Sequence, residues 1–101
     1  MTVGPSYDRR LILRVLRTRR ATFRRCYETA QERHRGLEGR VVVRWTIDPS
    51  GAVQGTHVAA SSLRQPAVEA CVLDVLRTLR SVPAPGGGTL RIRYPFEFRP
   101  A

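Results

Sequence analysis

The sequence contains no long apolar run. Near its N-terminus, the apolar segment Leu11-Ile12-Leu13 is interrupted at once by Arg14. A membrane-spanning helix needs about 20 predominantly apolar residues, and a secretory signal peptide needs an uninterrupted apolar core. The sequence therefore offers neither, and we expect either a cytosolic protein or a domain cut from a longer exported one.

Residue patterns typical of catalysis, metal binding and phosphate binding are also missing. The two histidines, His34 and His57, do not fall at zinc-ligand spacings with the two cysteines, and neither is placed as a base for a cysteine nucleophile. The carboxylates are scattered, and Gly86-Gly87-Gly88 lacks the Lys-Ser/Thr and helix of a phosphate loop. We therefore expect a protein that is not an enzyme and that holds no metal or cofactor.

Lysine is absent as well. All 18 basic residues are arginine, and eight acidic residues leave a formal net charge of +10. A GC-rich genome would explain the choice of arginine over lysine, but not the excess of positive charge. That excess is local, since ten arginines and only three acidic residues lie between residues 8 and 35. A surface of this kind attracts phosphate, anionic lipid or acidic protein.

Apolar residues recur at helical spacing in two segments, Asp8 to His34 and about Pro66 to Arg80. Pro66 suits the first turn of the second helix. Arg19 falls in the middle of the apolar face of the first helix. That helix therefore either bends near residues 18–22 or extends its first half beyond the core, and we favour the overhang.

Three segments show the alternation of half-buried strands. The first, Val41–Ile47, leads into the turn Asp48-Pro49-Ser50-Gly51, where Gly51 is expected to take a positive φ. The return strand, Ala52–Ala60, needs a bulge near Gln54-Gly55 to keep its apolar residues on one face. The last strand begins at Leu90 and alternates to Phe98.

A chain of 101 residues forms one domain. We expect residues 1–7 to be a flexible lead-in and residues 8–101 to form the domain. The fold class is α+β, a three-stranded antiparallel sheet with two helices on one face, in the order α-β-β-α-β. A right-handed crossover places Val41–Ile47 at the centre and the last strand at an edge, where Pro95 is tolerated.

Several segments in consistent order, covering roughly residues 10–99, carry a family resemblance. They are Arg25-Cys26-Tyr27-Glu28, the stretches 37–44, 47–51, 58–63, 66–72 and 83–88, and Tyr94-Pro95-Phe96. With these residues the chain resembles the TonB C-terminal domain, in the two-cysteine form found in myxobacterial envelope and gliding proteins of the AgmX/PglI type. The resemblance implies a non-enzymatic interaction domain of a cell-envelope protein that serves energy transduction, transport or gliding motility.

The only two cysteines, Cys26 and Cys71, lie on the inward faces of the two predicted helices. From the residues alone, they are compatible with a disulfide, a metal pair or ordinary buried thiols. The resemblance implies a Cys26–Cys71 disulfide, and a disulfide implies an oxidising compartment such as the periplasm. On this basis we expect a periplasmic domain that forms the C-terminal part of an inner-membrane-anchored protein.

The resemblance also implies that the last strand binds a partner. The TonB family pairs this strand with a short N-terminal peptide of outer-membrane TonB-dependent receptors, by β-strand addition. The expected partner-binding residues are Thr89, Leu90, Arg91, Ile92, Arg93, Tyr94, Phe96 and Glu97. Main-chain groups would supply affinity and the charged side chains selectivity, with weaker pairing at Pro95, which lacks a donor. The alternatives are a plain edge protected by proline and charge, or a strand that swaps between copies to form a homodimer.

The arginines of the first helix form a basic face made of Arg10, Arg14, Arg17, Arg20 and Arg24. It is compatible with a solvated surface, with contact to an anionic membrane or acidic partner, or with nucleic acid. A face made almost only of arginine would bind nucleic acid through phosphates, without reading sequence. A sequence-nonspecific nucleic-acid-binding domain is therefore the alternative function, although we disfavour it.

Overall fold

The computed structural model describes residues 9–80 and 88–100. The expected lead-in at residues 1–7, the expected helix start at Asp8 and the glycine-rich loop up to residue 87 lie outside the described residues. The elements, in chain order, are α1 (Arg9–Arg17), α2 (Arg20–Gln31), β1 (Gly39–Ile47), β2 (Val53–Ser61), α3 (Pro66–Arg77) and β3 (Leu90–Phe98). The predicted α+β class with a three-stranded antiparallel sheet is confirmed.

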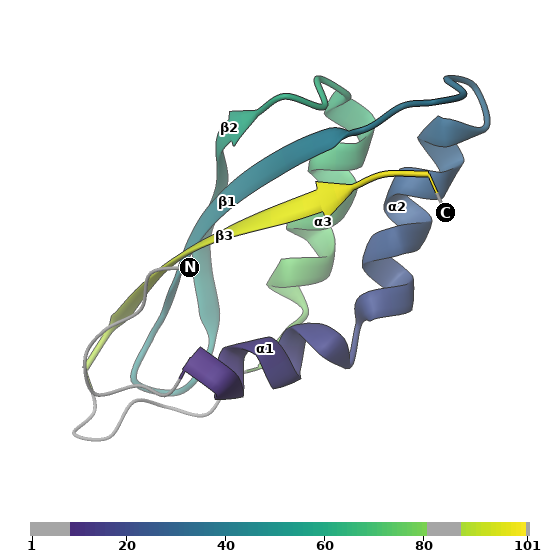
Figure 1. Ribbon diagram of the computed structural model, residues 1–101. Coiled ribbons are helices and arrows are strands. Elements are labelled where there is room, and N and C mark those ends of the chain that lie inside the picture. Colours follow the sequence, from purple (N-terminus) through teal and green to yellow (C-terminus); the bar gives the residue numbers. More distant parts are fainter. Residues whose placement is uncertain (1–8, 81–87, 101) are drawn as a thin grey trace.

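The sheet has the strand order β2-β1-β3, and β1 is antiparallel to both neighbours. The predicted central and edge positions are therefore confirmed. The helices lie on one side of the sheet (Figure 1), where they cover the apolar face of β1. The opposite face, which we call the outer face, carries Arg40, Val42, Arg44 and Thr46 of β1 and Arg91, Arg93, Pro95 and Glu97 of β3.

The core lies between the helices and the inner face of the sheet. β1 contributes alternate residues, and Trp45 is only 3% exposed. The helices contribute apolar side chains at helical spacing, as their sequence periodicity requires. The main buried side chains are Ile12, Leu16, Phe23, Tyr27, Val41, Val43, Trp45, Ile47, Val68, Val72, Leu76, Ile92, Phe96 and Phe98.

The N-terminal helix is divided in two, so the favoured overhang was wrong and the bend was right. The first helix ends at Arg17, and Arg19 departs from helical geometry with φ −116° and ψ 17°. The Thr18 hydroxyl donates to the Val15 carbonyl at 2.6 Å, which helps to close the last turn of α1. The break leaves Arg19 exposed while the chain direction changes (Figure 1). As a result, Ile12 and Leu16 of α1 are buried rather than suspended beyond the core.

The second strand is irregular. Its register against β1 shifts between Arg44 and Thr46, where Gly55 takes a φ of +63°. The predicted bulge near Gln54-Gly55 is therefore confirmed. A second shift between Val42 and Val43 was not predicted. The pairing of β1 with β3, by contrast, runs without a shift from Gly39↔Phe98 to Ile47↔Leu90.

The turn between β1 and β2 is organised by the Asp48 side chain. Its Oδ1 accepts hydrogen bonds from the Ser50 N–H at 2.9 Å, the Ala52 N–H at 3.0 Å and the Ser50 hydroxyl at 2.6 Å. Gly51 takes the expected positive φ, at +88°. The Ser50 hydroxyl, together with the two N–H groups, lowers the pKa of Asp48 below its ordinary value.

We expect Asp48→Asn to lower the melting temperature at pH 7 and to have a smaller effect at pH 2. Because the folded-state pKa of Asp48 is depressed, its ionised form stabilises the native protein above about pH 4. That contribution is lost as the pH falls through the lower, folded-state pKa. Thermal unfolding of both proteins between pH 7 and pH 2 tests this, and a difference that is constant over that range would contradict it.

Candidate functional site

The third strand forms one edge of the sheet. β3 pairs with β1 on one side, and in the described part of the chain no strand pairs with its other side (Figure 1). β2 is the other edge, but its two register shifts interrupt the row of main-chain groups. Side chains of β2 also meet α3, since Arg77 Nε donates to the Thr56 hydroxyl at 3.0 Å. β3 is therefore the regular edge of this sheet.

The register shows which main-chain groups of β3 face outward. Pro95 lies opposite Val42 in an unshifted ladder and has no N–H, so this pair is not hydrogen-bonded across the two strands. The even-numbered residues of β1 direct their main-chain groups to β2 instead. Arg40 is an example, since its carbonyl accepts a hydrogen bond from the Ser62 N–H at 2.9 Å. Hence the N–H groups of Arg91, Arg93 and Glu97, and the carbonyls of these residues and Pro95, face the free edge.

Aromatic side chains join β3 to α2. The rings of Phe23 and Phe96 lie 4.7 Å apart between centroids, and those of Tyr27 and Phe98 are stacked at 5.3 Å. The buried Tyr27 hydroxyl donates to the Leu37 carbonyl, and burial raises the pKa of Tyr27. These contacts fix the position of the edge strand relative to α2.

A groove of about 580 Å³ lies beside the C-terminal half of β3, from Tyr94 onward, between this strand and the two N-terminal helices. Its floor is apolar, with Leu16, Phe23 and Phe96 among the lining residues. Its helical rim is basic, because Arg17, Arg20 and Arg24 also line it. An extended peptide paired with this half of β3 would direct every second side chain into this groove.

The break between α1 and α2 divides the predicted basic face. Arg10, Arg14 and Arg17 lie on α1, whereas Arg20 and Arg24 lie on α2. Arg17, the last residue of α1, lines the groove together with Arg20 and Arg24, whereas Arg10 and Arg14 are not among the groove-lining residues. Arg24 is partly engaged within the protein: its Nη2 donates to the Arg99 carbonyl at 3.5 Å, and its Nε lies 3.7 Å from Glu28. The sequence did not reveal this proximity of the basic residues to the edge strand.

The expected partner-binding residues of β3 divide by face. Leu90, Ile92 and Phe96 point into the core, while Arg91, Arg93 and Glu97 are exposed and Tyr94 is half-buried. Thr89 is exposed but precedes β3, which begins at Leu90, so its assignment to the strand was wrong. Arg40 Nη2 and Nε donate to Glu97 Oε1 at 2.5 and 3.1 Å, and Arg99 lies 3.6 Å from Glu97 Oε2. Glu97 is therefore already occupied by two arginines.

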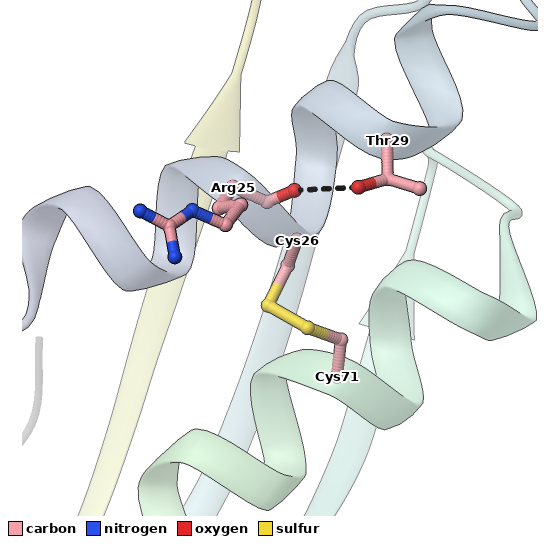
Figure 2. Close-up of a disulfide and its surroundings, with 4 residues drawn as sticks. All are labelled: Arg25, Cys26, Thr29 and Cys71. Carbon is pink, nitrogen blue, oxygen red and sulfur yellow. Dashed lines mark hydrogen bonds between the residues drawn. A yellow bond between two sulfur atoms is a disulfide. The ribbon is translucent and has the colours of Figure 1, made fainter.

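The predicted disulfide is present between Cys26 and Cys71 (Figure 2). It joins α2 to α3 across 45 residues of sequence, with the two Cα atoms 5.7 Å apart. Beside it, the Thr29 hydroxyl donates to the Arg25 carbonyl at 3.2 Å (Figure 2). The disulfide holds in place the helix that forms one wall of the groove.

Neither a metal site nor a membrane span is found in residues 9–80 and 88–100. No three histidine, cysteine, aspartate or glutamate side chains in this part of the chain are grouped as metal ligands. None of the helices described is both long and apolar enough to cross a bilayer.

Comparisons with known proteins agree on one family. The family model described as "Gram-negative bacterial TonB protein C-terminal" matches residues 29–100. The solution structure of the Pseudomonas aeruginosa TonB C-terminal domain is similar, with a TM-score of 0.55 and 26% identity over 69% of this chain and 73% of that chain. The Helicobacter pylori TonB C-terminal domain has a TM-score of 0.55 over 96% of this chain and 87% of that chain, at 17% identity, which shows the fold alone. No curated protein gave a significant match.

Proposed function

Because the chain belongs to the family of Gram-negative bacterial TonB protein C-terminal domains, which are non-enzymatic protein-interaction domains, we propose that it binds a partner peptide by β-strand addition along β3. The observation that carries this proposal is the free edge of β3. Its outward N–H groups, at Arg91, Arg93 and Glu97, form a regular row that an extended peptide can continue.

The groove beside β3 supports the same function. Backbone pairing gives affinity without sequence preference, and pockets for alternate side chains give specificity. Here the apolar floor around Phe23 and Phe96 suits aliphatic side chains, and it is held rigidly by aromatic packing. A preformed groove lowers the ordering cost of binding, because only the peptide loses conformational freedom.

We propose that the domain acts in the periplasm, as the C-terminal part of an inner-membrane-anchored protein, and that its partner is an outer-membrane TonB-dependent receptor. The Cys26–Cys71 disulfide supports an oxidising compartment. Family membership supports a role in energy transduction or transport. The two-cysteine gliding-motility form remains a prediction from the sequence resemblance.

The arrangement of the arginines does not support the alternative function, nucleic-acid binding. Binding driven by phosphates needs arginines along one continuous surface. The break after Arg17 separates α1 from α2, and Arg20 and Arg24 of α2 line the groove beside β3 rather than continuing the row of Arg10 and Arg14. We therefore do not propose it.

Titration of isotopically labelled protein with synthetic N-terminal peptides of TonB-dependent receptors from the same organism tests the proposal. We expect slowed hydrogen exchange and large amide shifts at Arg91, Arg93 and Glu97, since these N–H groups would become hydrogen-bonded. Shifts confined to α1 would contradict strand addition. Sedimentation of the free protein supplies the control, because a dimer that protects the same amides would indicate strand exchange between copies.

A further inference from the structure

Cations gather on one half of the outer face without counter-charges. In the β1–β3 ladder, Arg44 lies directly opposite Arg93, and Arg91 lies opposite Thr46. On the other side of Arg44 lies His57 of β2. In residues 9–80 and 88–100, Arg44, Arg91 and Arg93 have no carboxylate within ion-pair distance. Like charges placed directly opposite in a sheet are destabilising, so this arrangement carries a cost in the free protein.

The same face differs at its other end. There Arg40 and Arg99 are both paired with Glu97. A hollow of about 450 Å³ lies over the unpaired half, and Arg44, Arg91 and Arg93 line it. The unpaired charge is therefore confined to one segment of β3, rather than spread along the strand.

This segment coincides with the main-chain donors of the free edge. Arg91 and Arg93 direct their N–H groups to the edge and their side chains to the outer face, because both are odd positions of β3. In a strand added to β3, the residues opposite Arg91 and Arg93 are two apart, and their side chains lie on that same outer face. This holds for a parallel or an antiparallel strand, because side chains alternate with a period of two in both.

We propose that the strand added to β3 carries two carboxylate side chains, two residues apart, that pair with Arg91 and Arg93 on the outer face. This inference rests on the proposed function and specifies the chemistry of the partner: an extended acidic peptide in which one apolar residue separates the two acids. The intervening residue lies opposite the buried Ile92, on the apolar inner face of the sheet. The next residue on that face, opposite Tyr94, enters the groove, whose lining includes Phe23 and Phe96. No acid is specified at the position opposite Glu97, because Arg40 and Arg99 already pair with the Glu97 carboxylate there.

Three seven-residue peptides test the inference against the intact, oxidised protein. The first is Thr-Val-Glu-Val-Glu-Val-Thr, the second has glutamine and the third has lysine at the two glutamate positions. We expect the glutamate peptide to bind about 2- to 30-fold more tightly than the glutamine peptide, from two opposite-charge cross-strand pairs. The lysine peptide should bind most weakly, and the differences should shrink at high salt.

The double variant Arg91→Ala/Arg93→Ala should bind the glutamate and glutamine peptides with equal affinity. The matched control Arg33→Ala/Arg35→Ala removes the same charge from exposed positions in the loop that follows α2 and should preserve the preference. Equal binding of both peptides at the β3 amides of the unsubstituted protein would overturn this inference alone. Absence of any shift at those amides would overturn strand addition as well. A preference that survives Arg91→Ala/Arg93→Ala would place the acids elsewhere, against the rim of the groove, and would also overturn the inference.

Discussion

Replacing both cysteines, as Cys26→Ala/Cys71→Ala, is expected to lower the free energy of unfolding by about 4 kcal/mol. The bond closes a loop of 45 residues, and opening it restores chain entropy to the unfolded state. Domains of this size have total stabilities of about 5–15 kcal/mol, so the loss is a large share of the whole. The melting temperature should fall by about 15 to 30 °C.

Urea unfolding followed by fluorescence measures this effect directly. Trp45 is the only tryptophan, is 3% exposed, and will report its transfer to water. Wild-type protein with the disulfide reduced is the matched control, because it lacks the bond but keeps both side chains. A shift in melting temperature below about 5 °C in both proteins would show that the bond adds little to stability.

The disulfide also helps to hold one wall of the groove in position. α2 carries Cys26 as well as Phe23, Arg20 and Arg24, and these last three line the groove beside β3. Cleavage of the bond releases α2 from α3 and leaves its position to the aromatic contacts with β3. In a reducing compartment the wall of the groove formed by α2 would therefore be held less firmly. This agrees with the proposed periplasmic role.

Local patterns in the sequence predicted most of the fold. The alternation in β1 and β3, the Asp48–Gly51 turn and the bulge at Gly55 all follow from rules that span a few residues. The strand order followed from crossover handedness together with the edge preference of Pro95. The strands, the turn and the bulge depend on residues that are close together in the chain, and the strand order follows from a general rule of handedness, so the amino-acid sequence alone is enough to derive them.

The break between α1 and α2 could not be decided in the same way. Arg19 falls on the apolar face of the predicted helix, which a single straight helix packed on the core does not explain. A bend and an overhang both explain it, and they differ only in tertiary packing. The chain adopts the bend because it buries Ile12 and Leu16 against the sheet, and an overhanging helix would leave both in water. The outcome depends on the position of residues far along the chain.

Likewise, only part of the candidate site could be predicted from the sequence. The sequence resemblance indicated β3 as the binding strand, and the alternation assigned Arg91 and Arg93 to its outer side. The register of β3 against β1, however, is what places Arg44 opposite Arg93, and it depends on pairing across about 50 residues of sequence. The approach of Arg17, Arg20 and Arg24 to the edge depends on the helix break. Both features arise from contacts between distant segments, which local patterns do not encode.

The variant Arg93→Pro is expected to bind the glutamine peptide about 5- to 150-fold more weakly than the variant Arg93→Ala does. Proline removes an outward N–H without disturbing the ladder to β1, because Arg93, like Pro95, occupies a position not hydrogen-bonded to that strand. A peptide carbonyl then loses its donor, which costs about 1–3 kcal/mol. With Pro95 two residues away, the free edge would lack two successive donors in its middle.

This pair of variants separates main-chain recognition from charge. Both remove the guanidinium, and the glutamine peptide carries no acid to respond to its loss, so any difference between them reports the N–H group alone. Equal melting temperatures for Arg93→Pro and Arg93→Ala would establish that the proline is tolerated at this edge. If the two stable variants then bound the glutamine peptide equally well, the edge of β3 would not be where the peptide pairs, and affinity would have to come from side chains in the groove.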